Sequence, residues 1–387
     1  DFAPSLTGLA PHAQNTPSDA PLLVDFTHST LATTMLPYSA WAKAVRRTLS
    51  DESAASLAEA ASAAGSPELR SAIADHLRQY RGMDVSPDQV VIGAGSQTLY
   101  QLLVQLLGRT RRYAVEDPGY PLLTRMYEQQ DAQVAHIGLD DSGINVAALE
   151  TSDASVAHIM PSHQFPTGIV TTAARRRELL NWAREGDRYL IEDDYDSEFR
   201  FSGLPIPTLQ SLDTRGRVIY LNTFSKTIAP ALRISYMILP QALLARWRST
   251  MGFYSCAVPS FEQLTLTRFL DGGYFERHVS RMKKHYKARL QGLLALLAQP
   301  ETARLCTARQ AVAGLHFLLE FHTKERGQSL RAALGDAGLS APLLSEFYLR
   351  KSPAEAERCA VVQYSGLTEA DFAESLQKLS QRLTPEA

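Results

Sequence analysis

The chain has 387 residues, of which 45% are hydrophobic and 21% charged, as in a soluble globular protein with a large buried core. Its formal net charge of −2 excludes the positive field expected of a chain that binds nucleic acid over its whole length. No apolar run approaches the roughly 20 residues that span a bilayer, and no signal-peptide pattern opens the sequence, so we expect no membrane association. The three cysteines form no CxxC pair, which favours a cytoplasmic location.

The first stretch of the chain has the composition of a linker. Residues 1–21 are rich in Pro, Ser, Thr and Ala and show no periodicity, so we expect a linker or an extended arm. From Pro37 the apolar spacing of Trp41, Val45 and Leu49 suggests a first helix, and a second helix follows it. Ser66 suits an N-cap, Pro67 suits the first helical position, and Gly82 suits the residue that ends the helix.

Short apolar strands then alternate with helical stretches, which predicts a largely parallel sheet covered on both faces. The expected strands are residues 90–92, 113–115, 156–160, 189–191, 218–221 and 234–239. A long amphipathic helix is expected over 259–294, and we expect His278 and His285 to occupy solvated positions on it rather than to bind a metal. Strands at 314–321 and 359–364 and a closing helix at 368–383 indicate a smaller α+β unit.

A glycine turn joins the first of these strands to a helix. It contains Gly95, and Ser96 and Gln97 follow it. Backbone amides at a helix N-terminus, approached closely because of the glycines, can bind a phosphate. A Rossmann nucleotide site is the alternative, although GAGSQT lacks the third glycine and no acidic residue closes a second strand at the usual distance.

Acidic residues follow the fourth strand in IEDDYD. Asp193 and Tyr195 lie two apart, so in extended chain they face the same side. A carboxylate there can pair with a pyridinium nitrogen, and a phenol beside it can bind the 3-hydroxyl of the ring. An acidic loop or a divalent-cation site is the alternative. A metal site would not explain the phosphate turn or the lysine that follows the fifth strand.

That lysine is Lys226, at the carboxyl edge of the sheet, where open α/β folds bind ligands. Thr223 and Ser225 place hydroxyls before it, and Arg233 lies one loop further on. The set suits an amine that forms a Schiff base with an aldehyde cofactor beside a phosphate-binding cluster. A surface lysine in a Ser/Thr loop is the alternative.

Two more strand ends carry polar or aromatic groups. Tyr120, in a Pro-Gly turn, is placed to stack on a planar ring, although such a tyrosine can be structural. His163 and Gln164 supply polar side chains before another turn. Five strand ends together therefore offer a phosphate cup, a stacking ring, polar ligands, a ring-nitrogen acid and an amine.

With these motifs the chain resembles fold-type I pyridoxal-phosphate proteins, and more narrowly the aminotransferase-like domain of MocR/GabR-type bacterial transcription regulators. The likeness runs from about Phe26 onward and rests on VEDPGYP, PSHQFPTG, IEDDYDSEFRF, GRVIYLNTFSKTIAPALRISYMILP and FEQLTLTRFLDGGYFERHVSRM. It implies Lys226 as the Schiff-base lysine, Asp193 as partner of the ring nitrogen and Tyr195 as partner of the 3-oxygen. The full expected cofactor set is Gly95, Ser96, Gln97, Tyr120, His163, Gln164, Asp193, Tyr195, Thr223, Ser225, Lys226 and Arg233, with no metal.

The resemblance implies a fold-type I α/β architecture with a large domain and a smaller C-terminal α+β domain. The expected boundaries are a linker or arm at 1–21, an N-terminal segment packing with the small domain at 22–50, a large cofactor-binding domain at 51–258, and a long helix with the small domain at 259–387. A homodimer is implied as well, as is a small amine or amino-acid effector, or pyridoxal phosphate itself. Because no helix-turn-helix or basic stripe is present, DNA would be bound only through a module absent from this chain.

The sequence also departs from the family pattern. Ala60 stands where a tyrosine usually reaches the phosphate of the partner subunit. Val361 falls where aminotransferases usually bind the substrate carboxylate with an arginine, although Arg350 or Arg358 could substitute. The residues expected to bind the cofactor are thus present, whereas those expected to bind a substrate amino acid are altered. We therefore expect an effector-sensing domain, with a working pyridoxal-phosphate-dependent aminotransferase as the alternative.

Overall fold

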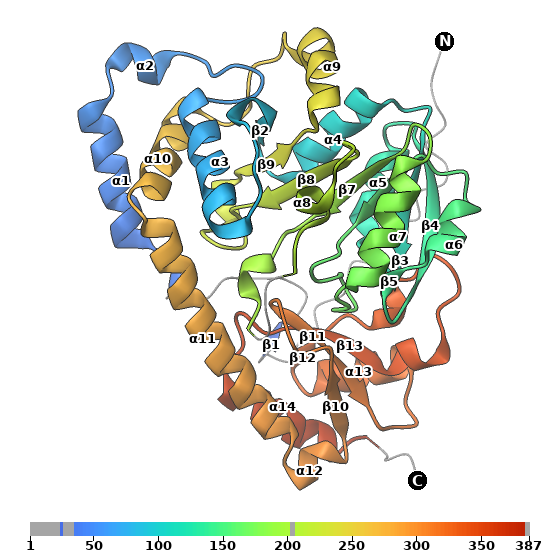
Figure 1. The fold of residues 1–387 in the computed structure, drawn as a ribbon. Helices are drawn as coiled ribbons and strands as arrows, with labels where there is room; N and C mark the ends of the chain where they lie inside the picture. Colours follow the sequence, from blue (N-terminus) through green and yellow to red (C-terminus); the bar gives the residue numbers. More distant parts are fainter. Residues whose placement is uncertain (1–23, 26–34, 202–205, 384–387) are drawn as a thin grey trace, which may run out of the picture.

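The computed structural model describes residues 24–25, 35–201 and 206–383, and an eight-stranded sheet lies at the centre of its larger part (Figure 1). The strands of this large sheet, in spatial order, are β2 (Val90–Gly93), β9 (Ser235–Ile238), β8 (Val218–Thr223), β7 (Tyr189–Asp193), β6 (Val156–Ile159), β3 (Arg112–Asp117), β4 (Gln133–Asp140) and β5 (Gly143–Ile144). The five strands from β8 to β4 pair in parallel, and the pairs β2–β9, β9–β8 and β4–β5 are antiparallel. The predicted, largely parallel sheet is confirmed.

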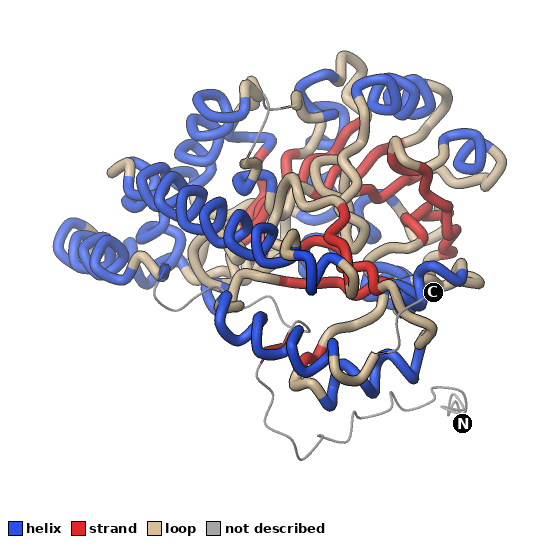
Figure 2. Tube along the Cα trace, turned by 90° about the horizontal axis from the view of Figure 1, so that it is seen from below, coloured by secondary structure: helices blue, strands red, loops and turns tan. Residues whose placement is uncertain are grey.

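Helices cover both faces of the large sheet, as the buried runs of its strands require (Figure 2). One face packs against α4 (Ser96–Leu107), α5 (Pro121–Glu128) and α9 (Gln241–Met251). The other face packs against α3 (Pro67–Arg81), α6 (Val146–Glu150), α7 (Ala173–Arg184) and α10 (Ser260–Asp271). The short helices α2 (Ala54–Ala58) and α8 (Leu209–Leu212) complete this part, and α1 (Tyr38–Asp51) packs on α10.

The helix α3 begins and ends as the sequence indicates. The hydroxyl of Ser66 accepts a hydrogen bond from the amide of Leu69 at 3.2 Å, and Pro67 occupies the first turn. Gly82 follows the helix in the left-handed conformation, with φ 64°. Both signals are local, so a single sequence is enough to place them.

A smaller unit follows in the chain, built on an antiparallel sheet in the order β10 (Cys306–Arg309), β11 (His316–Phe321) and β13 (Cys359–Gln363). Its helices are α12 (Pro300–Ala303), α13 (Gly327–Asp336) and α14 (Glu369–Ser380). The short strand β1 (Val24–Asp25) pairs in parallel with β12 (Leu339–Ser340) of this unit. The helix α11 (Tyr274–Leu297) runs from the large sheet to the small unit (Figure 1).

The single long helix expected over 259–294 is wrong, because the chain turns at Gly272 and Gly273 between α10 and α11. Gly273 has φ 61°, a conformation that glycine adopts without strain. The solvated position expected for His278 is also wrong. Its side chain is buried, and its Nε2 lies 2.6 Å from the carbonyl oxygen of Thr227.

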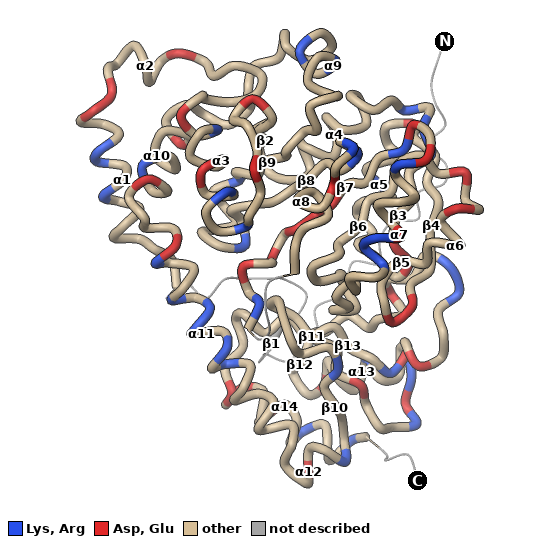
Figure 3. Tube along the Cα trace, in the orientation of Figure 1, with Lys and Arg blue, Asp and Glu red and all other residues tan. Residues whose placement is uncertain are grey.

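Charge is spread unevenly over the fold. Basic residues predominate along α11, whereas acidic residues gather in the chain that leaves β7 and leads toward the small unit (Figure 3). Among the described residues, no helix combines the length and the apolar composition that a membrane span requires.

Candidate functional site

The loops that follow β2, β3, β6, β7 and β8 meet at one edge of the large sheet. The last four strands are parallel, so they end on the same side. β2 is antiparallel to β9, which is antiparallel to β8, so β2 ends there too. Arg233 precedes β9 and therefore lies at the same edge. The sequence-predicted site residues are thus brought to the carboxyl edge, where open α/β sheets bind ligands.

The N-terminus of α4 forms one wall of this edge. Gly95 occupies the N-cap position and offers no side chain to bind the first amide groups of the helix. Ser96 and Gln97 begin the helix, and the side chain of Gln97 is exposed. A Cβ added to Gly95 would lie 2.2 Å from Nη2 of Arg233, so the guanidinium sits directly over the turn. Free amides and an arginine at a helix N-terminus form an anion site.

Hydroxyl groups surround the turn after β8. The Thr223 hydroxyl oxygen accepts hydrogen bonds from the Ser225 amide at 3.1 Å and from the Ser235 hydroxyl at 2.8 Å. The hydroxyl oxygen of Ser225 is buried and has no partner among the described residues. A buried hydroxyl is costly to leave unpaired, so this atom is a further candidate ligand of an anion.

Lys226 follows directly. No hydrogen bond or ion pair holds its amine within the described part of the chain. Burial lowers the pKa of Lys226, while the negative charge of Asp196 opposes that shift. Burial therefore favours the uncharged amine, which is the nucleophilic form.

Asp193, the last residue of β7, is buried among hydrogen-bond donors. The hydroxyl of Tyr100 donates to its Oδ2 at 2.5 Å, and Nε2 of His158 lies 3.3 Å from the same oxygen. The ring of His158 is held in turn by Tyr127, whose hydroxyl lies 2.5 Å from Nδ1. These contacts fix the orientation of the carboxylate.

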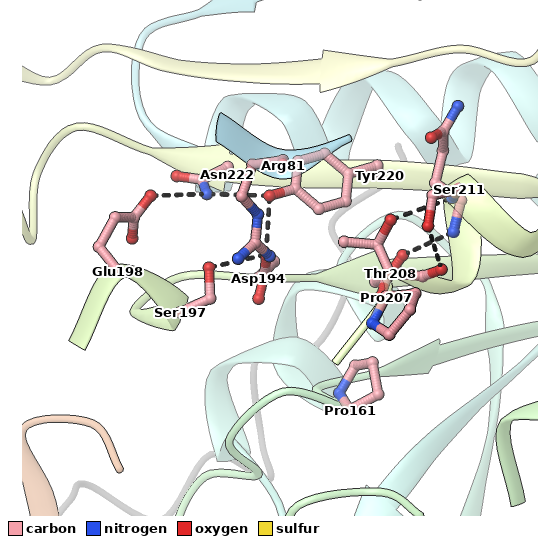
Figure 4. A network of polar contacts seen from close by, with 12 residues as sticks. Arg81, Pro161, Asp194, Ser197, Glu198, Pro207, Thr208, Ser211, Tyr220 and Asn222 are labelled. Carbon is pink, nitrogen blue, oxygen red and sulfur yellow. Dashed lines mark hydrogen bonds and ion pairs between the residues drawn. The ribbon is translucent and has the colours of Figure 1, made fainter. Parts of the chain in front are cut away.

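Asp194 points to the opposite face of the sheet, into the network of Figure 4. Its Oδ2 forms an ion pair with Arg81 at the end of α3 and accepts hydrogen bonds from the Tyr220 hydroxyl at 2.7 Å and the Ser197 hydroxyl at 2.8 Å. Because neighbouring residues of extended chain alternate, this network holds Asp193 on the side of α4. The acidic loop expected as an alternative is therefore a set of paired charges.

Tyr195, Asp196 and His163 form a second buried cluster. The hydroxyl of Tyr195 donates to the carbonyl oxygen of His163 at 3.0 Å, and Nδ1 of His163 lies 2.9 Å from Oδ2 of Asp196. The ring of His316 packs on His163 with centroids 4.2 Å apart. The cluster has the spacing of a metal site, because it offers three ligand atoms that all lie within 4.8 Å of one another. These atoms belong to His163, Asp196 and His316. Gly314 allows this packing, because a Cβ there would lie 2.0 Å from the His163 ring.

Tyr120 and Gln164 lie nearby in different roles. The ring of Tyr120 meets Phe165 edge to face at 5.9 Å. Burial raises the pKa of Tyr120, the charge of Asp193 raises it further, and the charge of Arg233 lowers it. The amide of Gln164 is already used by the chain: its nitrogen donates to the carbonyl of Pro118 at 3.0 Å and its oxygen accepts from two donors of Thr167.

Sequence reasoning missed Tyr100, His158, Asp196 and Glu116. Burial raises the pKa of Glu116 to about 8, while hydrogen bonds from Met160 and Gln164 oppose the shift. A signal was available for two of the four residues. His158 is a polar residue inside a buried strand, and Tyr100 lies one helical turn after Ser96.

The two residues that depart from the family pattern, Ala60 and Val361, differ in burial. Ala60 is exposed, beside a backbone hydrogen bond of 3.3 Å from Cys256 to Ala61. Val361 is fully buried in an apolar cluster with Leu318 and Leu344. The position counted as the carboxylate site is thus part of the core of the small unit.

The comparisons with known proteins agree with this geometry. Residues 23–378 match the family model of aminotransferase class I and II. The uncharacterized HTH-type transcriptional regulator YdeL of Bacillus subtilis is 35% identical over 356 residues, which are 92% of this chain and 76% of YdeL. The probable rhizopine catabolism regulatory protein MocR of Rhizobium meliloti is 31% identical over 320 residues, 81% of this chain and 63% of MocR.

A solved structure shows the same fold. The kynurenine aminotransferase of Pyrococcus horikoshii, in complex with PMP, superposes with a TM-score of 0.79 over 94% of this chain and 91% of its own, at 23% identity. The expected fold-type I architecture and the resemblance to MocR-type regulators are both confirmed. The chain belongs to the aminotransferase class I and II family, and that membership indicates pyridoxal phosphate as its cofactor.

Proposed function

We propose that the chain is the pyridoxal-phosphate-binding, effector-sensing domain of a transcription regulator. Two features at one edge of the sheet carry the proposal. The N-terminus of α4 has no side-chain cap and lies under Arg233, and the amine of Lys226 has no partner among the described residues. The regulator names of YdeL and MocR support the regulatory part. DNA would be contacted through a module outside residues 1–387, in the cytoplasm.

The residues of the site fit the cofactor. The phosphate would be held by the first amides of α4, at Ser96 and Gln97, by the hydroxyls of Thr223 and Ser225, and by Arg233. The unpaired Ser225 oxygen and the bare Gly95 turn are the features that such an anion would complete. Pyridoxal phosphate supplies an aldehyde for a lysine amine and a ring that withdraws electrons once its nitrogen is protonated.

The chain's own groups then have distinct tasks. Lys226 offers an amine that burial keeps nucleophilic. Asp193, fixed by Tyr100 and His158, presents a carboxylate that would hold a proton at the ring nitrogen. Tyr195 would bind the 3-oxygen and Tyr120 would stack on the ring. His163 and Gln164 would act by shaping the loop behind them, because most of their polar atoms already bind the protein.

A working aminotransferase remains the second candidate, because it would use the same cofactor residues. The burial of Val361 among apolar side chains favours the sensor, since no arginine projects from that position to orient a substrate carboxylate. Steady-state production of keto acid from common amino-donor and keto-acid pairs tests the choice. Turnover near background, together with an absorbance shift on adding an amine or amino acid, is the expected result. Robust multiple turnover would establish the aminotransferase instead.

We further infer that the domain forms a homodimer and responds to a small amine or amino acid, or to pyridoxal phosphate itself. Phe253 and Tyr254 are exposed, and their rings lie 4.4 Å apart. The chain that follows them is joined to Ala61 through the backbone of Cys256, next to Ala60. The candidate contact surface consists of this exposed aromatic pair, the apolar segment 254–259 and Ala60.

A further inference from the structure

A cleft of about 610 Å³ lies between the two units. Its walls are the end of α3, the first half of α11, the chain at Asp196–Arg200 and the turn at Gly314. It shares His163 and Asp196 with the candidate site, but neither Lys226 nor the α4 N-terminus lines it. The volume is that of a small-molecule pocket.

Buried polar atoms without partners collect around this cleft. Each is enclosed by protein and has no hydrogen bond within the described residues, which is uncommon because such atoms are costly. Five of them belong to residues that line the cleft: Arg81 Nε, His163 Nε2, Glu198 Oε2, Arg200 Nε and Glu276 Oε2. Their gathering at one place indicates that polar groups of a ligand complete them.

Arg200 and Lys283 are the available positive charges of the cleft, and Arg200 has the better geometry for a carboxylate. Its guanidinium makes no hydrogen bond or ion pair with any described residue, although Glu198 is only two residues away. Arg81, by contrast, is neutralised by Asp194. An arginine with free donors suits a carboxylate, which it can bind through two parallel hydrogen bonds.

Two carboxylates supply the opposite charge. Oε1 of Glu198 accepts a hydrogen bond from the Asn222 amide at 3.3 Å, seen in Figure 4, and Oε1 of Glu276 lies 3.1 Å from Nδ1 of His76. The second oxygen of each carboxylate is unpaired. The cleft therefore presents two cations, Arg200 and Lys283, and two carboxylate oxygens, so its charge is not of a single sign.

We propose that this cleft is a second ligand site, separate from the cofactor lysine, for a small zwitterion that carries both an ammonium and a carboxylate group. Arg200 binds the carboxylate, Glu198 and Glu276 bind the ammonium, and the side chains of Phe275 and Val279 cover the carbon chain between them. The balance of signs disfavours a phosphate, which would meet both carboxylates. Since the walls come from both units, an occupied cleft biases their relative position.

Isothermal titration of the full chain tests this with L-alanine, β-alanine and 5-aminovalerate, which separate the two charges by increasing lengths. At least one of them is expected to bind, and this binding should persist in Lys226→Ala, in which the cofactor lysine is absent. Arg200→Gln keeps the side-chain length but loses the charge, and should weaken binding about tenfold or more. Arg215→Gln, the same change at an exposed arginine outside the cleft, should bind as the wild type.

A second variant tests the site independently, in case Arg200→Gln fails to fold. Ser280 is exposed and lines the cleft, so Ser280→Phe fills space without removing a charge and should abolish binding while near-ultraviolet circular dichroism stays unchanged. Propionate and ethylamine, which each carry one of the two charges, should bind far more weakly. The proposal is overturned if none of the three zwitterions binds, or if binding is lost in Lys226→Ala and kept in Arg200→Gln. Equal binding of propionate or inorganic phosphate would reduce the cleft to an anion site and would overturn it as well.

Discussion

His278 of α11 donates a hydrogen bond from Nε2 to the carbonyl oxygen of Thr227 at 2.6 Å, so the helix between the two units is tied to the residue after Lys226. Its other ring nitrogen, Nδ1, accepts a hydrogen bond from Arg281 at 3.1 Å. A neutral imidazole satisfies both contacts, whereas a protonated one would place a second positive charge beside Arg281. Burial, with the charge of Arg281, lowers the pKa of His278 to about 4, although the Thr227 hydrogen bond opposes the shift.

This histidine predicts loss of stability in mild acid. The unfolded chain binds the proton near the ordinary pKa of 6.5 and the folded chain only near 4, so the stabilising effect is complete above 6.5 and falls away between those values. Between pH 7.5 and pH 5 the loss due to His278 should be about 2 kcal/mol. Urea unfolding at the two pH values measures it. His278→Asn should lower stability at both but show a smaller difference, and an equal difference would contradict the assignment.

Lys226→Ala should remove the covalent attachment of the cofactor. The wild-type chain, reduced with borohydride, is expected to carry a fixed adduct on Lys226, located by peptide mass mapping. The variant should retain weaker binding through the phosphate-binding groups. An adduct on another lysine would show that the site is assigned to the wrong residue.

Gly95→Ala should weaken cofactor binding by displacing Arg233, since the added Cβ would lie 2.2 Å from Nη2. Loss of one charged hydrogen bond corresponds to about a tenfold rise in the dissociation constant or more. Gly186→Ala is a matched control, because Gly186 also has a positive φ, 71°, but no atom within 4 Å of the added carbon. If both variants weakened cofactor binding to the same extent, backbone strain rather than the displaced arginine would explain the weaker binding.

Asp193→Ala should weaken cofactor binding about tenfold or more and change its absorbance spectrum, because the ring nitrogen would lose a buried charged partner. Titration followed by absorbance gives both quantities. Asp141→Ala, at an exposed position in the turn between β4 and β5, should leave both quantities unchanged. An unaltered dissociation constant for Asp193→Ala would indicate that this carboxylate serves only Tyr100 and His158.

If the exposed aromatic pair forms the dimer contact, its substitution should separate the dimer into monomers. Light scattering of the wild-type chain at micromolar concentrations should give the mass of a dimer, and the double variant Phe253→Ser and Tyr254→Ser should shift it toward the monomer. Tyr38→Ser is a control, since Tyr38 is as exposed as Phe253 but lies on α1. A monomeric wild type would exclude the homodimer.

Much of the fold and of the site edge was predictable because the signals are local. Buried strands read as apolar runs, and parallel strands must end on one side of the sheet, so Lys226, Asp193 and the Gly95 turn could be placed together before any contact was known. The Ser66 cap and Gly82 depend on three or four consecutive residues, which a single sequence also contains.

The remainder depended on contacts between distant segments. The helix pattern runs on through Gly272 and Gly273, and only packing shows that the chain turns there. Counting from Tyr364 placed Val361 at a ligand site, but strand pairing buries it against Leu318 instead. Val361→Arg would therefore bury an unpaired charge rather than restore an anchor.

The parallel pairing of Val24–Asp25 with Leu339–Ser340 has a mechanical consequence. Polypeptide that enters at Val24 is fastened first to the small unit and not to the sheet that carries Lys226. A pull or a reorientation transmitted through an upstream segment would therefore load the small unit directly. The helix α11 connects the two units, and His278 joins it to the lysine loop, so such a load would reach the residue next to Lys226 through this hydrogen bond.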